Sequence, residues 1–195
     1  MSFNYFLLYV YLILYIIVVF ILFWWFVDFL IAWIRRAAPE VPSDSRLRAA
    51  VLDQIATHYP NAKSVMDIGC CYGGLTRLVA KRFPKTHVTG VECMPIPFAV
   101  AKMSRIVRGP KNCGFVWGDI FKFLAGGDKS GPRKFDIGIA YLLPPMMPKI
   151  QAVRSHFKVL LVLDFPLPTA KPTRVIPLHK NFMGQHTLYV YENKN

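Results

Sequence analysis

The pattern of apolar and polar positions divides the chain into a wholly apolar beginning and a longer part in which short apolar segments alternate with polar ones. Residues 5–27 (YFLLYVYLILYIIVVFILFWWFV) carry no charge over 23 positions. A helix of this length measures about 35 Å, which is enough to cross the hydrocarbon core of a bilayer with some tilt. A signal peptide has a basic beginning and a shorter apolar run. The pattern therefore predicts a transmembrane anchor over residues 1–34.

The charges beside this anchor predict its orientation. Arg35 and Arg36 follow it at once, and no Lys or Arg precedes it. Basic residues near the end of a membrane helix favour the cytoplasmic side. We therefore expect a single-pass membrane protein whose remaining chain lies on the cytoplasmic side of the membrane.

Residues 35–45 contain Pro and Ser, a composition that predicts a linker. Residues 46–195 are predicted to form one folded domain. Residues 46–58 form an amphipathic helix in this prediction. Short apolar strands are predicted at 64–68, 87–92, 114–118, 135–142 and 158–164. Helices are predicted at 75–83, 98–107 and 146–157, and a closing hairpin at 173–178 and 186–191. This alternation predicts an α/β fold: a Rossmann-like, mostly parallel sheet of about seven strands with helices on both faces.

The first predicted strand runs into a turn that contains glycine. Residues 67–74 read D-I-G-C-C-Y-G-G, with glycines at Gly69 and Gly73. Glycine allows a sharp turn and a close approach of the backbone to a ligand, although a plain strand-to-helix turn also favours it. Ligands of parallel α/β folds bind at the carboxyl ends of the strands. The turn is therefore a candidate ligand site, but a weak one by itself.

Acidic residues close the next two predicted strands. Glu92 ends the second strand, 23 residues after Gly69, where an acid can accept both hydroxyls of a ribose. Gly118 and Asp119 end the third strand, where a carboxylate can accept from an exocyclic amine. A single acid at a strand end is usually a solvated one. Acids at successive strand ends, together with the turn, make a stronger case for a binding site.

These motifs resemble those of the class I S-adenosylmethionine-dependent methyltransferases, which share the D-x-G-x-x-x-G turn and the two acidic strand ends. The resemblance implies S-adenosylmethionine as the cofactor. It further implies that Asp67, Gly69 and Gly73 surround the methionine end of the cofactor, that Glu92 binds the ribose, and that Asp119 lies near the adenine.

Cys71 also belongs to this implied cofactor site, at a position where the family usually has glycine. A cysteine lacks the freedom of glycine at positive φ. We therefore expect a reshaped turn or a weaker hold on the cofactor. A catalytically inactive relative that serves as a scaffold is the alternative.

Three short segments narrow the resemblance, namely E-V-P-S at 40–43, A-Y-L-L-P at 140–144 and D-F-P-L-P at 164–168. They are similar to segments of the membrane-associated lysine methyltransferases that act on the c-subunit of ATP synthase, and of their bacterial relatives. The resemblance implies methyl transfer to a protein lysine, and RNA, a lipid or a small molecule is the alternative acceptor. Tyr141 is the candidate catalytic residue, because its hydroxyl can accept from or orient the amine. A bacterial inner membrane suits this reading, and a mitochondrial inner membrane is the alternative.

The basic charge adds an expected partner. The chain after the apolar segment contains 24 Lys and Arg residues and 10 Asp and Glu residues. A basic domain beside a bilayer is attracted to anionic headgroups, so we expect contact with an anionic lipid surface. The basic residues are scattered without an aromatic-interleaved stripe, which argues against nucleic acid. The four cysteines and five histidines lack the spacing of metal ligands, so the sequence predicts no metal site.

Overall fold

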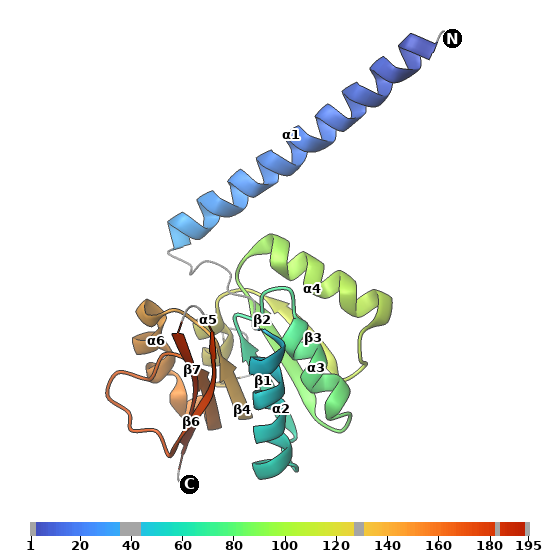
Figure 1. Ribbon diagram of the computed structural model, residues 1–195. Coiled ribbons are helices and arrows are strands. Elements are labelled where there is room, and N and C mark those ends of the chain that lie inside the picture. The colour runs from blue at the N-terminus through green and yellow to red at the C-terminus, as the bar shows by residue number, and fades with distance from the viewer. Residues whose placement is uncertain (1–2, 36–43, 127–130, 182–183, 194–195) are drawn as a thin grey trace. The chain divides into compact units, whose positions relative to one another are not determined.

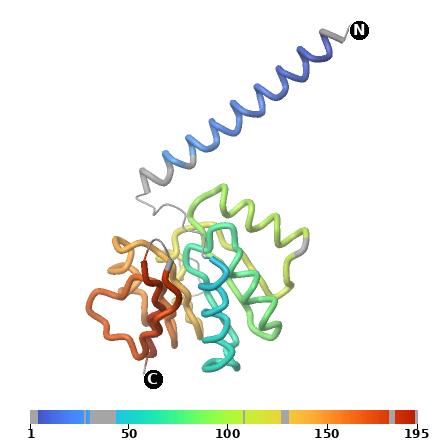
Figure 2. Tube along the Cα trace, viewed as in Figure 1, coloured from blue at the N-terminus to red at the C-terminus, as the bar shows by residue number. Residues whose placement is uncertain are grey.

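The computed structural model describes residues 3–35, 44–126, 131–181 and 184–193. The chain falls into two compact units, Met1–Pro39 and Glu40–Asn195. Figure 1 labels the helices and strands of both units, and Figure 2 traces the described segments by residue number.

The first unit consists of one long helix, α1 (Phe3–Arg35). Its segment Tyr5–Val27 has a mean hydropathy of 3.0, and none of this segment is buried. By length and composition, the segment is suited to span a membrane. A helix that is apolar on every side is stable only where other apolar groups surround it.

The second unit is built on a seven-stranded sheet in the order β3-β2-β1-β4-β5-β7-β6. The strands are β1 (Ser64–Ile68), β2 (His87–Glu92), β3 (Cys113–Trp117), β4 (Phe135–Ala140), β5 (Phe157–Leu163), β6 (Arg174–Asn181) and β7 (Gly184–Glu192). Strands β1 to β5 pair in parallel, whereas β7 is antiparallel to both β5 and β6. The prediction of a mostly parallel, Rossmann-like sheet of about seven strands is confirmed.

Helices cover both faces of this sheet, as predicted (Figure 1). They are α2 (Ser45–His58), α3 (Gly74–Arg82), α4 (Pro95–Arg108), α5 (Ile120–Ala125) and α6 (Met147–Ala152). Neighbouring strand residues such as Val65 and Met66 enter opposite apolar clusters, because successive side chains of a strand point to opposite faces. One cluster includes α2 and α3, and the other includes α5 and α6.

Two segments differ from the prediction. The single helix expected at 146–157 is divided into α6 and two short 3-10 helices, Pro144–Met146 and Arg154–His156. Pro144 and Pro148 lie in the first turns of two of these helices, where a missing backbone N–H is tolerated, and the interruption at Val153 involves no proline. Helix α5 was not predicted, since its six residues are too few to display a helical period.

Candidate functional site

The turn between β1 and α3 is held in a conformation that favours glycine. Gly69, Cys71 and Gly73 have φ angles of 69°, 50° and 69°. The amides of Gly69 and Cys70 both donate to the carbonyl oxygen of Val91 in β2, at 3.0 and 3.1 Å. The turn is thereby fastened to the neighbouring strand end.

The two glycines are also required by space. A Cβ on Gly69 would lie 2.8 Å from Cδ2 of Leu142, and a Cβ on Gly73 would lie 2.4 Å from Cζ of Phe115. Both contacts are too short for carbon atoms, so larger residues at these positions would displace the side chains that pack there.

Cys71 adopts the left-handed region although it carries a Cβ, which disfavours this conformation by about 1–2 kcal/mol. Its amide donates to Oε2 of Glu92 at 2.8 Å, and this bond helps to hold the conformation. The turn therefore keeps the positive φ that a glycine would favour. A reshaped turn and a weaker hold on the cofactor both stay predictions.

Glu92 ends β2 as a buried carboxylate with a fixed orientation. Oε2 accepts from the amide of Cys71, and Oε1 accepts from the amide of Met94 at 2.9 Å. A carboxylate has about four acceptor sites, and these two bonds occupy one on each oxygen. Glu92 therefore keeps acceptor capacity for the hydroxyl groups of a ligand.

Asp67 lies in β1 and is buried beneath the turn. The hydroxyl of Thr76 donates to its Oδ2 at 2.6 Å. Burial raises the pKa of Asp67 to about 6, and the nearby charge of Glu92 contributes to this increase. Since the ionised carboxyl lacks full solvation, a cation placed beside it would be bound favourably.

A cavity of about 200 Å³ lies over the turn and combines opposite charges. Asp67 lines it together with Arg48 of α2, Arg77 of α3 and Tyr141, which follows β4. This arrangement suits a zwitterion, whose ammonium group would face Asp67 and whose carboxylate would face the arginines. Neither arginine was predicted, because no local motif marks a side chain that reaches the turn from a helix.

The structure gathers only part of the predicted cofactor site around this cavity. Asp67, Gly69 and Cys71 line it, whereas Gly73, Glu92 and Asp119 are not among its lining residues. Asp119 is exposed and caps α5, with its Oδ1 accepting from the amide of Phe121 at 2.7 Å. Pockets for whole ligands measure about 300–1,000 Å³, so this cavity fits one end of an extended ligand.

Tyr141 is paired with an acid that the sequence analysis did not select. Its half-buried hydroxyl hydrogen-bonds to the carboxylate of Asp164, which follows β5. Burial and this acid raise the pKa of Tyr141 to about 12, so the hydroxyl keeps its proton near neutral pH. Asp164 has a φ of 64°, and its Oδ1 accepts from the amide of Thr187 at 3.1 Å.

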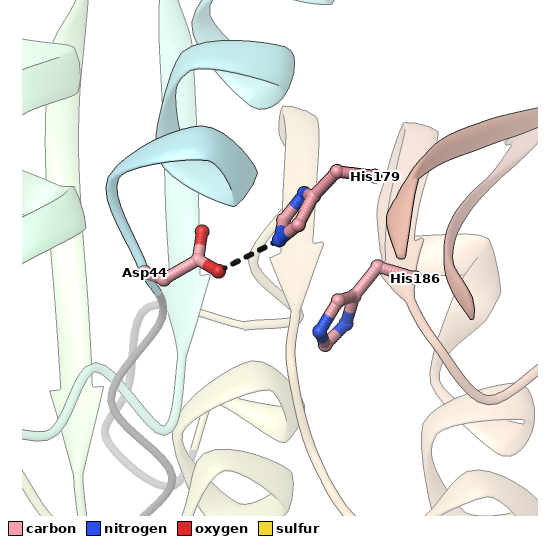
Figure 3. Close-up of side chains that lie close together, drawn as sticks. All are labelled: Asp44, His179 and His186. Carbon is pink, nitrogen blue, oxygen red and sulfur yellow. Dashed lines mark hydrogen bonds and ion pairs between the residues drawn. The ribbon is translucent and has the colours of Figure 1, made fainter. Parts of the chain in front are cut away.

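Two histidines of the β6–β7 hairpin, His179 and His186, lie close to Asp44 (Figure 3). His186 Nδ1 is 2.8 Å from Oδ2 of Asp164, and His179 Nε2 is 2.9 Å from Oδ2 of Asp44. One ligand atom from each of Asp44, His179 and His186 lies within 4.8 Å of the other two, a donor set that suits a transition metal. His179 connects the residue that caps α2 to the hairpin, and His186 connects the end of β5 to it.

Comparison with known proteins identifies the fold. The sequence matches no protein-family model and no curated protein. Solved structures do match, among them an RNA methyltransferase from Salinibacter ruber in complex with S-adenosyl-L-homocysteine, at 18% identity and a TM-score of 0.62, covering 78% of this chain and 93% of that one.

Two further matches are methyltransferases as well. The precorrin-6y C5,15-methyltransferase from Geobacter metallireducens is 12% identical with a TM-score of 0.60, covering 81% of this chain and 93% of that one. TrmK of M. capricolum, in complex with S-adenosyl-homocysteine, is 13% identical with a TM-score of 0.54. The match covers 74% of this chain and 68% of that one. At such identities the likeness defines the fold. This chain has the Rossmann-like fold of the class I methyltransferases.

The strain at Cys71 is testable by mutation. Cys71→Gly is expected to raise the free energy of unfolding by about 1 kcal/mol, because glycine adopts this φ without a penalty. Thermal unfolding of the full chain in mild detergent measures the difference. Cys71→Ala is the matched control, since it removes the thiol and keeps the Cβ. Equal stability of the two variants would show that the left-handed conformation is not strained.

The raised pKa of Asp67 predicts a pH-dependent stability. The unfolded chain releases this proton near pH 4, and the folded chain holds it to about pH 6. The free energy of unfolding therefore falls as the pH rises between these values, by an amount on the order of 3 kcal/mol. Asp67→Asn keeps an acceptor for Thr76 and is expected to flatten this slope in denaturant titrations. Asp53→Asn, on the exposed side of α2, is the control. A slope unchanged by Asp67→Asn would contradict the assignment.

Proposed function

We propose that this protein is a membrane-anchored methyltransferase that transfers a methyl group from S-adenosylmethionine to a lysine of a protein, with a membrane protein as the acceptor. The proposal rests on one observation above others: a buried acid, two arginines and a glycine turn meet at the strand ends of a methyltransferase fold. In this proposal residues 1–34 form the anchor, 35–45 the linker and 46–195 the catalytic domain.

The residues at the turn suit the methionine part and the ribose of the cofactor better than its adenine. Asp67 would bind the ammonium group, and Arg48 would bind the carboxylate of the methionine part. Glu92 has acceptor capacity for the ribose hydroxyls. Asp119 would have to accept from the adenine amine while it caps α5. The S-adenosyl-L-homocysteine bound by the Salinibacter ruber methyltransferase supports the choice of cofactor.

The cofactor supplies a methyl group on a positively charged sulfur. This methyl group would pass to the neutral lysine nitrogen, with the carbon–sulfur bond breaking as the carbon–nitrogen bond forms, and the methylated ammonium would release a proton to solvent. The protein has to align the two groups and exclude water. Leu142 and Leu143 follow Tyr141 in the chain, and an apolar surrounding would favour the neutral amine.

Tyr141 is proposed to orient this amine and not to remove its proton. With a pKa of about 12 its hydroxyl stays protonated, and it is engaged with Asp164. Its oxygen can then accept a hydrogen bond from an N–H of the lysine. This hydrogen bond directs the lone pair of the nitrogen toward the methyl group. Asp164, held by His186 and Thr187, positions the tyrosine.

RNA is the second candidate acceptor, because one surface feature suits phosphate groups. A cavity of about 820 Å³ is lined by Arg48, Arg77, Lys81 and Lys111, and its described lining includes no acid. The apolar α1 favours a membrane protein over RNA. A catalytically inactive scaffold is a third reading, and it would be consistent with the cysteine in the turn.

Cofactor binding is the first test of this proposal. Calorimetry on the full chain in detergent is expected to detect binding of S-adenosylmethionine. Arg48→Gln is expected to weaken the affinity for S-adenosylmethionine about 10- to 100-fold, because one charged hydrogen bond is lost. Arg46→Gln on the same helix is exposed and serves as the control. A folded wild-type chain that binds nothing at millimolar concentration would disprove the cofactor assignment.

The acceptor is tested by methyl-label transfer. The full chain and labelled S-adenosylmethionine are incubated with membranes and RNA from cells that lack the gene. Label is expected in the protein fraction, to disappear after protease, and to map to a lysine by mass spectrometry. Tyr141→Phe is expected to lower the rate about 10- to 100-fold through misalignment. Label in RNA or lipid would reject the lysine proposal.

A further inference from the structure

Helix α4 presents large apolar side chains to its surroundings. Val100, Met103, Ile106 and Val107 are between 44 and 74% exposed. Residues at this spacing lie along one side of an α-helix. A contiguous apolar face of this kind on a soluble domain marks a surface that contacts another apolar phase or molecule.

A basic side chain borders one edge of this apolar face. Lys102 is exposed and, at about 100° per residue, lies next to Ile106 on the helix surface. The sequence of α4 contains no Asp or Glu to oppose it.

Basic side chains also border the opposite edge. Arg77 of α3 donates to the hydroxyl of Ser104, which places α3 along that edge of α4. Arg77, Lys81 of α3 and Lys111, shortly after α4, line the basic cavity. The apolar face is therefore flanked by positive charge on both edges.

The chain itself indicates a bilayer as the partner of this face. Residues 36–43 separate α1 from the described part of the second unit, and eight residues reach at most about 30 Å. A membrane that receives α1 is thus within reach of the second unit. An aliphatic face bordered by Lys and Arg is typical of helices that lie in the interface of anionic membranes. Sites that bind single-stranded nucleic acid use aromatic side chains for stacking, and the four residues of this face include none.

We propose that α4 lies in the headgroup region of an anionic bilayer, with Val100, Met103, Ile106 and Val107 at the acyl-chain boundary and the basic side chains on lipid phosphates. The inference rests on the anchor in the proposed function but not on its chemistry. Because α4 begins three residues after Glu92, this contact brings the candidate site close to the membrane surface. An acceptor lysine near the headgroups would then be within reach.

Photo-crosslinking from defined positions tests this contact. The full chain carries p-benzoylphenylalanine in place of Met103 and is reconstituted into nanodiscs of phosphatidylcholine and phosphatidylglycerol. We expect lipid adducts by mass spectrometry after illumination, and several-fold fewer adducts in phosphatidylcholine alone. Val175 of β6 is apolar and 54% exposed, so the same probe there is the matched control and is expected to give background yield.

Position Leu14 in α1 serves as a separate report on the anchor. Adducts at 14 but not above background at 103 would overturn the contact and leave the anchor, and adducts at neither would overturn both. A crosslink from 103 to a second copy of the chain or to added RNA, in place of lipid, would also overturn it. The probe at Ile106 repeats the test at an independent position of the same face, with circular dichroism to verify folding. Because no methyl transfer is needed, the result does not depend on enzymatic activity.

Discussion

The attachment of the β1–α3 turn to the end of β2 is the constraint on which the candidate site depends. The amides of Gly69 and Cys70 share the carbonyl of Val91, and the amide of Cys71 is bound by Glu92. These bonds require positive φ at several positions within a few residues. The cavity over the turn is lined by Asp67 and by residues of the turn itself.

The same arrangement concentrates negative charge in a poorly solvated place. Asp67 is buried, and the charge of Glu92 raises its pKa further. Two acids near each other in a poorly solvated place reduce stability, and a protein keeps such a pair where it serves binding. A ligand with a positive charge would relieve this repulsion. The arginines at the rim add the complementary charge for a carboxylate, which explains why one small cavity contains both signs.

Local pattern was sufficient to predict the sheet and part of the site. Strands β1 and β2 occur at the predicted residues, because short apolar runs bounded by turn residues and charges have few other structures open to them. The glycine turn and the acid of Glu92 follow directly from those strands. The hydrogen bond between Tyr141 and Asp164 joins the ends of two strands. The hydrogen bond between Asp44 and His179 joins residues that are 135 positions apart in the sequence. Such contacts depend on strand order and tertiary packing, which cannot be predicted from the local periodicity of the sequence.

Helix α4 shows where a correct local prediction still omits the decisive feature. A helix was expected at 98–107, but the pattern did not reveal that its small residues face the sheet and its large ones face outward. Pro97 and Ala101 are buried, whereas Met103 and Ile106 are among the most exposed apolar side chains of the second unit. Packing through small residues lets α4 lie close to the sheet, but folding of the chain alone gives no reason for the large residues on the other side. The exposed faces of α1 and α4 are thus explained together if both contact lipid, the first across the bilayer and the second along its surface.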